Sequence, residues 1–220
     1  MNRTTLALSC LLASALALTV PAHGQPVAAN STAVWQSSAP MVSMFLKPDG
    51  SGTPLSSCFG GGGLVVPASV QVTLIDASGL PVAGYSERNI RLAYAGTNLG
   101  WCPDSFYPPP VHAPNCADGP TDPAGQTTFT MAYHGGGWHQ APMQIWVLEA
   151  GGNWAPIPNL LPINVNSPDY NGDLIINLSD IAIFAQDIGS FAYRSDFNWD
   201  GTINLSDIAM FAGVIGTSCP

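Results

Sequence analysis

The C-terminal part of the chain contains two copies of a pattern of oxygen-bearing side chains. The first copy begins at Asp169 and the second at Asp196, and each has such side chains at positions 1, 3, 5, 9 and 12 of a twelve-residue loop. Calcium takes six to eight oxygen ligands at roughly 2.3–2.6 Å, and loops with this spacing supply them, together with the carbonyl at position 7. The repeat therefore predicts one calcium site in each loop.

Each predicted site combines five side chains with one backbone carbonyl. The ligands of the first loop are Asp169, Asn171, Asp173, the Ile175 carbonyl, Asn177 and Asp180. Those of the second loop are Asp196, Asn198, Asp200, the Thr202 carbonyl, Asn204 and Asp207. Three carboxylates in one loop repel one another unless a cation lies between them, so we expect the binding of two calcium ions to be coupled to loop folding.

The two loops differ at position 6, where a sharp turn favours a glycine with positive φ. This residue is Gly201 in the second copy but Leu174 in the first. A non-glycine residue in that conformation costs about 1–2 kcal/mol. We therefore expect the first loop to bind calcium more weakly than the second.

Each loop is followed by an apolar pattern with helical spacing. The apolar positions are Ile181, Phe184, Ala185 and Ile188 in the first copy, and Ile208, Phe211, Ala212 and Ile215 in the second. This spacing predicts two short helices, each with one apolar face. A solvated surface turn would explain a single Asp/Asn-rich stretch, but two copies in register favour the metal site.

A loop followed by a helix, with no entering helix and with Asp at position 12, resembles the dockerin family over about residues 169–217. The resemblance implies a tandem half EF-hand, a small all-α module that docks onto a cohesin module of another protein. Positions 10 and 11, where dockerins often carry partner-reading residues, are Leu178-Ser179 and Leu205-Ser206. Leucine departs from the common small polar residue, so the expected partner is a cohesin-like protein or another cell-surface scaffold.

The N-terminus has the organisation of a secretory signal. Arg3 precedes an uncharged apolar run over 6–20, and Ala22-His23-Gly24 places small residues before Gln25. We therefore expect residues 1–24 to be a cleaved signal peptide and the protein to be secreted or on the cell surface. No other stretch is long enough to span a bilayer.

Four cysteines remain after this cleavage: Cys58, Cys102, Cys116 and Cys219. An even number suits an oxidising exterior. Cys102 and Cys116 flank a Pro-rich stretch, and a disulfide between them would stabilise it by roughly 3 kcal/mol. Cys58 could then pair with Cys219, although the sequence leaves all three pairings open. Zinc held by cysteine and His112 is a weaker alternative, because the spacing matches no usual zinc motif.

The segment 25–165 predicts an all-β sandwich. Strands are expected at 41–47, 70–76, 89–94, 126–133 and 143–149, separated by Gly- and Pro-rich turns. Alternation is clearest at Val70, Val72 and Leu74. The phrases over 72–84 and 121–129 resemble bacterial immunoglobulin-like domains of the invasin type, which implies an immunoglobulin-like β-sandwich. The predicted fold class is therefore mainly β, with a dockerin-like module over 166–220.

Catalytic chemistry finds little support in this sequence. It contains no nucleophile-elbow, metal-hydrolase or phosphate-loop pattern, and its two glutamates, Glu87 and Glu149, have no acid/base spacing. The segment 134–139, His-Gly-Gly-Gly-Trp-His, could stack on sugar or bind metal, but a hairpin tip is the favoured interpretation. Fourteen acidic against five basic residues disfavour nucleic acid.

These observations predict a secreted, non-catalytic protein whose calcium-binding dockerin-like module attaches it to a cohesin-like partner or a surface scaffold. The alternative is a polysaccharide-binding or polysaccharide-degrading accessory protein whose β-domain contacts glycan. A third alternative is that the tail packs on its own β-domain, fastened by Cys219.

Overall fold

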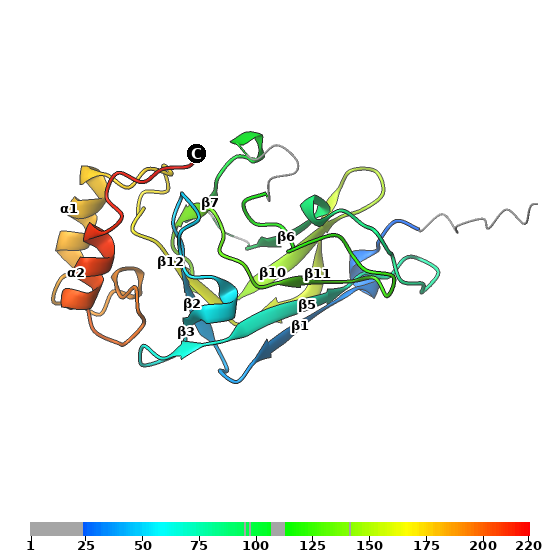
Figure 1. The fold of residues 1–220 in the computed structure, drawn as a ribbon, viewed down its shortest axis with the longest axis horizontal. Coiled ribbons are helices and arrows are strands. Elements are labelled where there is room, and N and C mark those ends of the chain that lie inside the picture. Colours follow the sequence, from blue (N-terminus) through cyan, green and yellow to red (C-terminus); the bar gives the residue numbers. More distant parts are fainter. Residues whose placement is uncertain (1–23, 95, 97, 107–112, 141) are drawn as a thin grey trace, which may run out of the picture.

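Two antiparallel β-sheets face each other in the computed structural model, which describes residues 24–94, 96, 98–106, 113–140 and 142–220. One sheet has the order β1-β5-β8, with β1 (Thr32–Ser37), β5 (Ala68–Thr73) and β8 (Gln126–Phe129). The other has the order β11-β10-β6, with β6 (Ile90–Ala93), β10 (Met143–Leu148) and β11 (Trp154–Leu161). The sheets lie one above the other in Figure 1. The predicted signal peptide lies outside the described residues except for Gly24.

Alternating apolar residues fill the space between these two sheets. Strands β5, β6 and β10 each bury every second residue, which is the pattern of a strand with one face on a core. Val70, Val72 and Leu74 are fully buried, as their alternation predicts. The five predicted strands correspond to β2, β5, β6, β8 and β10.

A third sheet closes the end of the sandwich that faces the C-terminal tail. It has the order β12-β2-β3-β4 and contains β2 (Val42–Phe45), β3 (Cys58–Phe59), β4 (Val65–Val66) and β12 (Ile163–Asn166). All residues of β2 and β12 are buried, so both faces of these strands are covered. Val42 and Met44 point into the sandwich core, whereas Phe45 belongs to an aromatic cluster of the tail.

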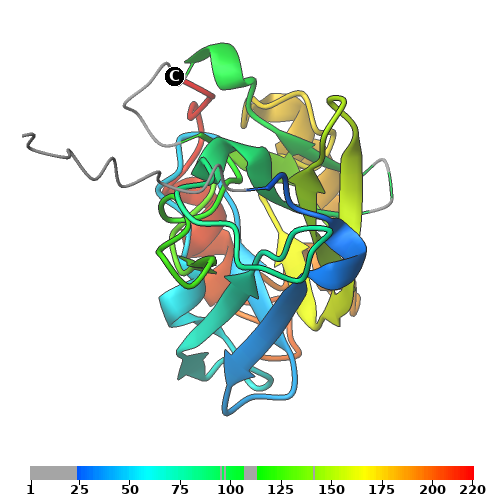
Figure 2. The same cartoon turned by 90° about the vertical axis from the view of Figure 1, so that its right-hand side faces the viewer.

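Shorter elements complete the chain. Strands β7 (Leu99–Trp101) and β9 (Gly135–Gly137) pair with each other. The tail contains α1 (Leu178–Asp187) and α2 (Leu205–Ala212), which lie side by side in Figures 1 and 2. Short 3-10 helices are η1 (Ala28–Asn30), η2 (Leu55–Ser57), η3 (Glu87–Asn89), η4 (Asp104–Phe106) and η5 (Tyr193–Ser195).

The prediction of a separate dockerin-like all-α module is wrong. The protein is mainly β, with two α-helices among the described residues, and these helices share their aromatic cluster with the third sheet. The Phe45 and Phe197 ring centroids are 5.1 Å apart. Helices this short bury too little apolar surface to be stable alone, so the tail uses a sheet face as the rest of its core. A β-sandwich is consistent with the remainder of the fold.

A disulfide fastens the C-terminus to the β-domain. It joins Cys102 to Cys219, with a Cα–Cα distance of 5.9 Å, so of the pairings that the sequence left open neither Cys102–Cys116 nor Cys58–Cys219 is formed. The last residues return to the first loop, where Cys219 N donates to the Leu174 carbonyl. Cys58 and Cys116 are buried thiols, and burial raises the pKa of each to about 11. The alternative in which the tail packs on its own β-domain agrees with these contacts.

The described part of the chain contains no helix with the length and apolarity needed to cross a bilayer.

Candidate functional site

The two repeat loops have similar hydrogen bonds around their first acid and equivalent ones around their last acid. The Asp169 carboxylate accepts from Gly172 N and Leu174 N, both at 2.9 Å. Its counterpart Asp196 accepts from Asp200 N at 3.0 Å and from Gly201 N at 2.8 Å. All of these donors are backbone amides of the same loop. The structure thus brings the residues of each predicted site together in a closed loop.

The last acid of each loop has two roles. Asp180 accepts from Tyr170 N at 2.8 Å, which closes the loop, and from Asn177 N at 2.9 Å, which completes the capping box of α1. Asp207 does the same in the second copy, with Phe197 N and Asn204 N as donors. A capping box satisfies amides at the helix start that have no intrahelical partner. The repeat therefore encodes loop closure and helix initiation with one residue.

The other predicted ligands lie on the outer part of each loop, where they bond to one another. The side-chain amides of Asn171 and Asn198 donate to the carboxylates two residues later, both at 2.9 Å. Those of Asn177 and Asn204 donate to the carbonyls two residues earlier, at 3.3 and 3.4 Å. These carbonyls belong to Ile175 and Thr202, and the carboxylates to Asp173 and Asp200.

The prediction that these loops bind two calcium ions is wrong. Among the described residues, no group of three or more His, Cys, Asp or Glu side chains is placed to hold a metal ion. The hydrogen bonds give the physical reason, because the loop's own amides already engage the oxygens that a metal would need. The expectation that the first loop binds calcium more weakly than the second depended on this prediction and is therefore also wrong.

The protein environment shifts the pKa values of the loop acids in opposite directions. Burial raises the pKa of Asp169 to about 6 and also raises the pKa of Asp196. The pKa of Asp200 is lowered by hydrogen bonds from the Thr202 hydroxyl and the Asn198 amide. Each loop therefore has a buried first acid whose charged form is disfavoured, and the second loop has a solvated acid whose charged form is favoured.

Left-handed backbone occurs at two positions in each loop. At position 6, Leu174 and Gly201 have φ values of 67° and 92°, as the turn requires. At position 4, Gly172 and Trp199 have φ values of 72° and 54°, which the sequence analysis did not anticipate. Each copy thus has one glycine and one non-glycine residue in this conformation. The glycine is at position 4 in the first copy and at position 6 in the second. Aligning Gly172 with Trp199 would have revealed the second position.

The segment 134–139 is not a hairpin tip, because its three glycines form β9. A Cβ on Gly136 would lie 1.8 Å from Asp169 Oδ2, so only glycine allows the first loop to approach this closely. Gly137 N donates to the Asp169 carbonyl at 2.7 Å. The glycine run therefore forms the contact surface for the first loop.

The outer faces of α1 and α2 are uncharged and largely apolar, and their exposed polar residues are Ser179, Gln186 and Ser206. Leu178 and Leu205, at equivalent positions of the repeat, are 79% and 80% exposed. Exposed Ala182 and Ala185 continue this surface on α1, as Ala209 and Ala212 do on α2. All residues of the two helices, 178–187 and 205–212, are described. They include three acidic residues, all of them buried, and no basic residue. We call this surface the helix face.

The apolar residues that the sequence placed on the buried face of each helix are only partly buried. Phe184 and Phe211 are buried, and their stacked rings join the helices at a centroid distance of 5.1 Å. Ile188 and Ile215, expected on the same buried faces, are instead about half exposed. The apolar surface of each helix is therefore wider than its packing requires.

Comparison with known proteins finds no match among protein families, curated proteins or solved structures. The invasin-type resemblance therefore rests on its two sequence phrases, and the repeat has to be interpreted from its own geometry.

Proposed function

We propose that this protein is a secreted, non-catalytic binding protein that attaches to a partner protein through the helix face. The observation that carries the proposal is a largely apolar exposed surface on both helices that has no charged side chain. Contiguous apolar patches on a soluble protein commonly mark interaction sites. The N-terminal signal pattern and the Cys102–Cys219 disulfide support an extracellular location.

The shape of the helix face indicates the chemistry of the partner. Small alanines lie along both helices, so another backbone can approach closely, and leucines at the helix starts project beyond them. Burying one leucine side chain contributes about 1.5–3 kcal/mol, and the repeat provides two equivalent leucines. The partner therefore needs an apolar surface with a recess for one leucine or both. A cohesin-like protein or a cell-surface scaffold, expected from the sequence, is one candidate.

A charge on the helix face tests the proposal. We would use the full mature chain and its Leu178→Asp/Leu205→Asp variant as baits for surface and secreted proteins of the producing organism, with quantification by mass spectrometry. Leu160→Asp is the matched control, because Leu160 is 61% exposed on β11. We expect a partner that the parent and the control retain and the double variant loses.

The single variants test the equivalence of the two leucines. If either can serve as the anchor, Leu178→Asp and Leu205→Asp should each weaken retention only partly. Circular dichroism should be unchanged, because both side chains are largely exposed. Retention of every captured protein by the double variant, or the absence of any specific partner, would refute the proposal.

A further inference from the structure

Four cavities follow one another along the junction between the β-sandwich and the C-terminal tail. Their volumes are about 410, 360, 220 and 340 Å³ in spatial order. Neighbouring cavities share wall residues: Gly61 and Trp199, then Gln140 and Tyr193, then Trp138 and Arg194. The cavities therefore adjoin one another in a row, which we call the furrow.

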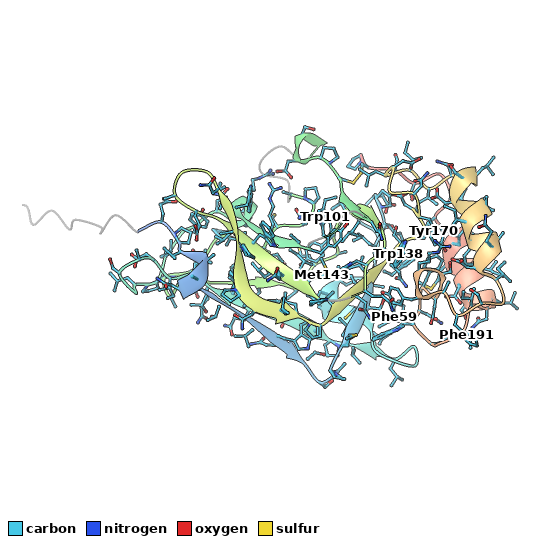
Figure 3. All side chains as sticks on the ribbon, turned by 180° about the vertical axis from the view of Figure 1, so that it is seen from behind. Phe59, Trp101, Trp138, Met143, Tyr170 and Phe191 are labelled. Atoms are coloured by element: carbon cyan, nitrogen blue, oxygen red, sulfur yellow. A yellow bond between two sulfur atoms is a disulfide. The ribbon has the colours of Figure 1, made fainter. Side chains whose placement is uncertain are left out.

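Every cavity of the furrow has an aromatic wall residue. Trp199 lines the first two cavities and Trp138 the last two. Phe191 lines the second cavity and Tyr193 the second and third, whereas Tyr170, which lines the fourth, is only 7% exposed. Phe191 is 91% exposed, which is unusual for a phenylalanine without a partner. Figure 3 shows Trp138 and Tyr170 at the junction and Phe191 on the tail. The furrow thus presents aromatic surfaces at intervals along its length.

The polar groups of the walls are mainly amides and hydroxyls. Gln140 and Thr202 lie in the second cavity, and Asn98 and Asn171 in the fourth. The one basic wall residue, Arg194, is paired with Asp187. The acids of the walls, Asp196 and Asp200, accept hydrogen bonds within their own loop.

From this arrangement we infer that the furrow binds a neutral, linear oligosaccharide. A sugar ring has an apolar C–H face that packs on an aromatic ring and a rim of hydroxyls that bond to amides and hydroxyls. Aromatic side chains combined with a few placed polar groups are what such a ligand needs. A chain of rings also fits a row of adjoining cavities. The net charge of −9 and the acids in the wall disfavour a polyanion.

The two walls of the furrow are fixed to each other. Gly63 N, in the β3–β4 connection, donates to the Trp199 carbonyl at 3.0 Å. The hydroxyls of Ser43 and Tyr193 are 2.8 Å apart. Because these bonds link the sandwich to the tail, the ligand would meet a preformed site and little ordering would oppose binding.

Trp199 gives an internal comparison within the repeat. Its φ of 54° is a conformation that a side-chain-bearing residue rarely adopts, and the equivalent position of the first copy is Gly172. The loop geometry therefore requires no tryptophan. Trp199 instead lines both of the first two cavities.

Affinity electrophoresis of the full mature chain tests the inference. The gels would contain soluble cellulose ether, xylan, glucomannan or mannan, and a polygalacturonate gel would represent a charged polymer. We expect slower migration in at least one neutral gel. Trp199→Gly removes the indole and suits the backbone, and Phe191→Ala removes an exposed ring, so both variants should fold. Each should bind at least tenfold more weakly.

Trp154→Ala is the control, because Trp154 is an exposed tryptophan on β11 and lines none of the four cavities. It should bind as the parent does, as should the helix-face double variant, which separates this inference from the proposed function. Equal migration in all neutral gels would overturn the inference. So would parental binding by both furrow variants, retardation only by polygalacturonate, or displacement of the saccharide by a casein peptide digest.

Discussion

Asp187 provides the sharpest test of how the tail is held together. It is the last residue of α1, where a negative charge opposes the helix dipole, and it is buried. Its carboxylate accepts from Arg194 Nε at 2.7 Å and Nη2 at 2.9 Å, and from the Ser195 hydroxyl at 2.6 Å. These bonds fix η5, which leads into the second loop. We would replace Asp187 with asparagine, which keeps the shape but removes the charge.

The expected decrease in the free energy of unfolding can be estimated from the exposure of the Asp187 and Arg194 side chains. The side chains are 8% exposed for Asp187 and 32% for Arg194, so the pair lies between a surface pair and a buried one. Surface pairs contribute about 0–1 kcal/mol, whereas breaking a buried pair costs about 3–5 kcal/mol. We therefore expect Asp187→Asn to lower the free energy of unfolding by about 2 kcal/mol. The control Asp49→Asn, at an exposed acid, should change it by less than about 0.5 kcal/mol.

The effect should depend on pH in a defined direction. Hydrogen bonds from Arg194 lower the pKa of Asp187, so the folded protein releases this proton more readily than the unfolded chain does. The stabilisation is therefore complete above the unfolded pKa of about 4 and is lost as the pH falls through the folded pKa. Urea unfolding followed by tryptophan fluorescence should show the difference between parent and variant shrinking as the pH is lowered below about 4.

A double-mutant cycle with Arg194→Gln isolates the pair. The coupling between the two substitutions should be about 1 kcal/mol or more at neutral pH. Two outcomes would refute the reasoning: a loss for Asp187→Asn no larger than that of the control, or a coupling free energy of zero. Either result would mean that the ion pair forms as a consequence of the tail's fold and does not stabilise it.

Three further substitutions test other parts of the fold. Cys219→Ser opens a disulfide with a sequence separation of 117, so the free energy of unfolding under non-reducing conditions should fall by about 4–5 kcal/mol. Phe45→Ala should cost about 3–4 kcal/mol in urea unfolding and make the tail sensitive to proteolysis, whereas Phe191→Ala should leave both unchanged. Gly201→Ala should lower the thermal midpoint by adding strain of about 1–2 kcal/mol, whereas Gly213→Ala, at right-handed backbone, should not.

Local patterns in the sequence predicted most of the sandwich. Alternating apolar residues bounded by turns located five strands, because burial on one face leaves a period of two. Strand β9 could not be found this way, since three glycines carry no pattern. Strand β11 was missed because it contains Pro156 and Pro158, which are tolerated at the edge of a sheet.

The repeat predicted its helices and loops but not their contacts. Spacing places oxygen atoms within one loop, but it cannot tell whether they face an ion or the loop's own amides, because that depends on the backbone conformation of the loop. It also cannot show that Phe45, far earlier in the chain, completes the aromatic cluster. The sequence did contain a signal for the ion pair of Asp187. The equivalent position of the second copy is Val214, so the acid is not part of the repeat and its presence indicates a separate interaction.

The two copies of the repeat differ mainly in their loops and agree at most helix positions. Gly172 and Leu174 of the first loop correspond to Trp199 and Gly201 of the second, whereas the buried Phe184 has an identical counterpart in Phe211. On the helix face, Leu178 and Leu205 are also identical and have nearly the same exposure. Packing cannot require a likeness between side chains that touch so little of the protein. Two matching exposed leucines therefore agree with the proposal that a partner contacts the helix face, and the Leu178→Asp/Leu205→Asp variant tests that proposal directly.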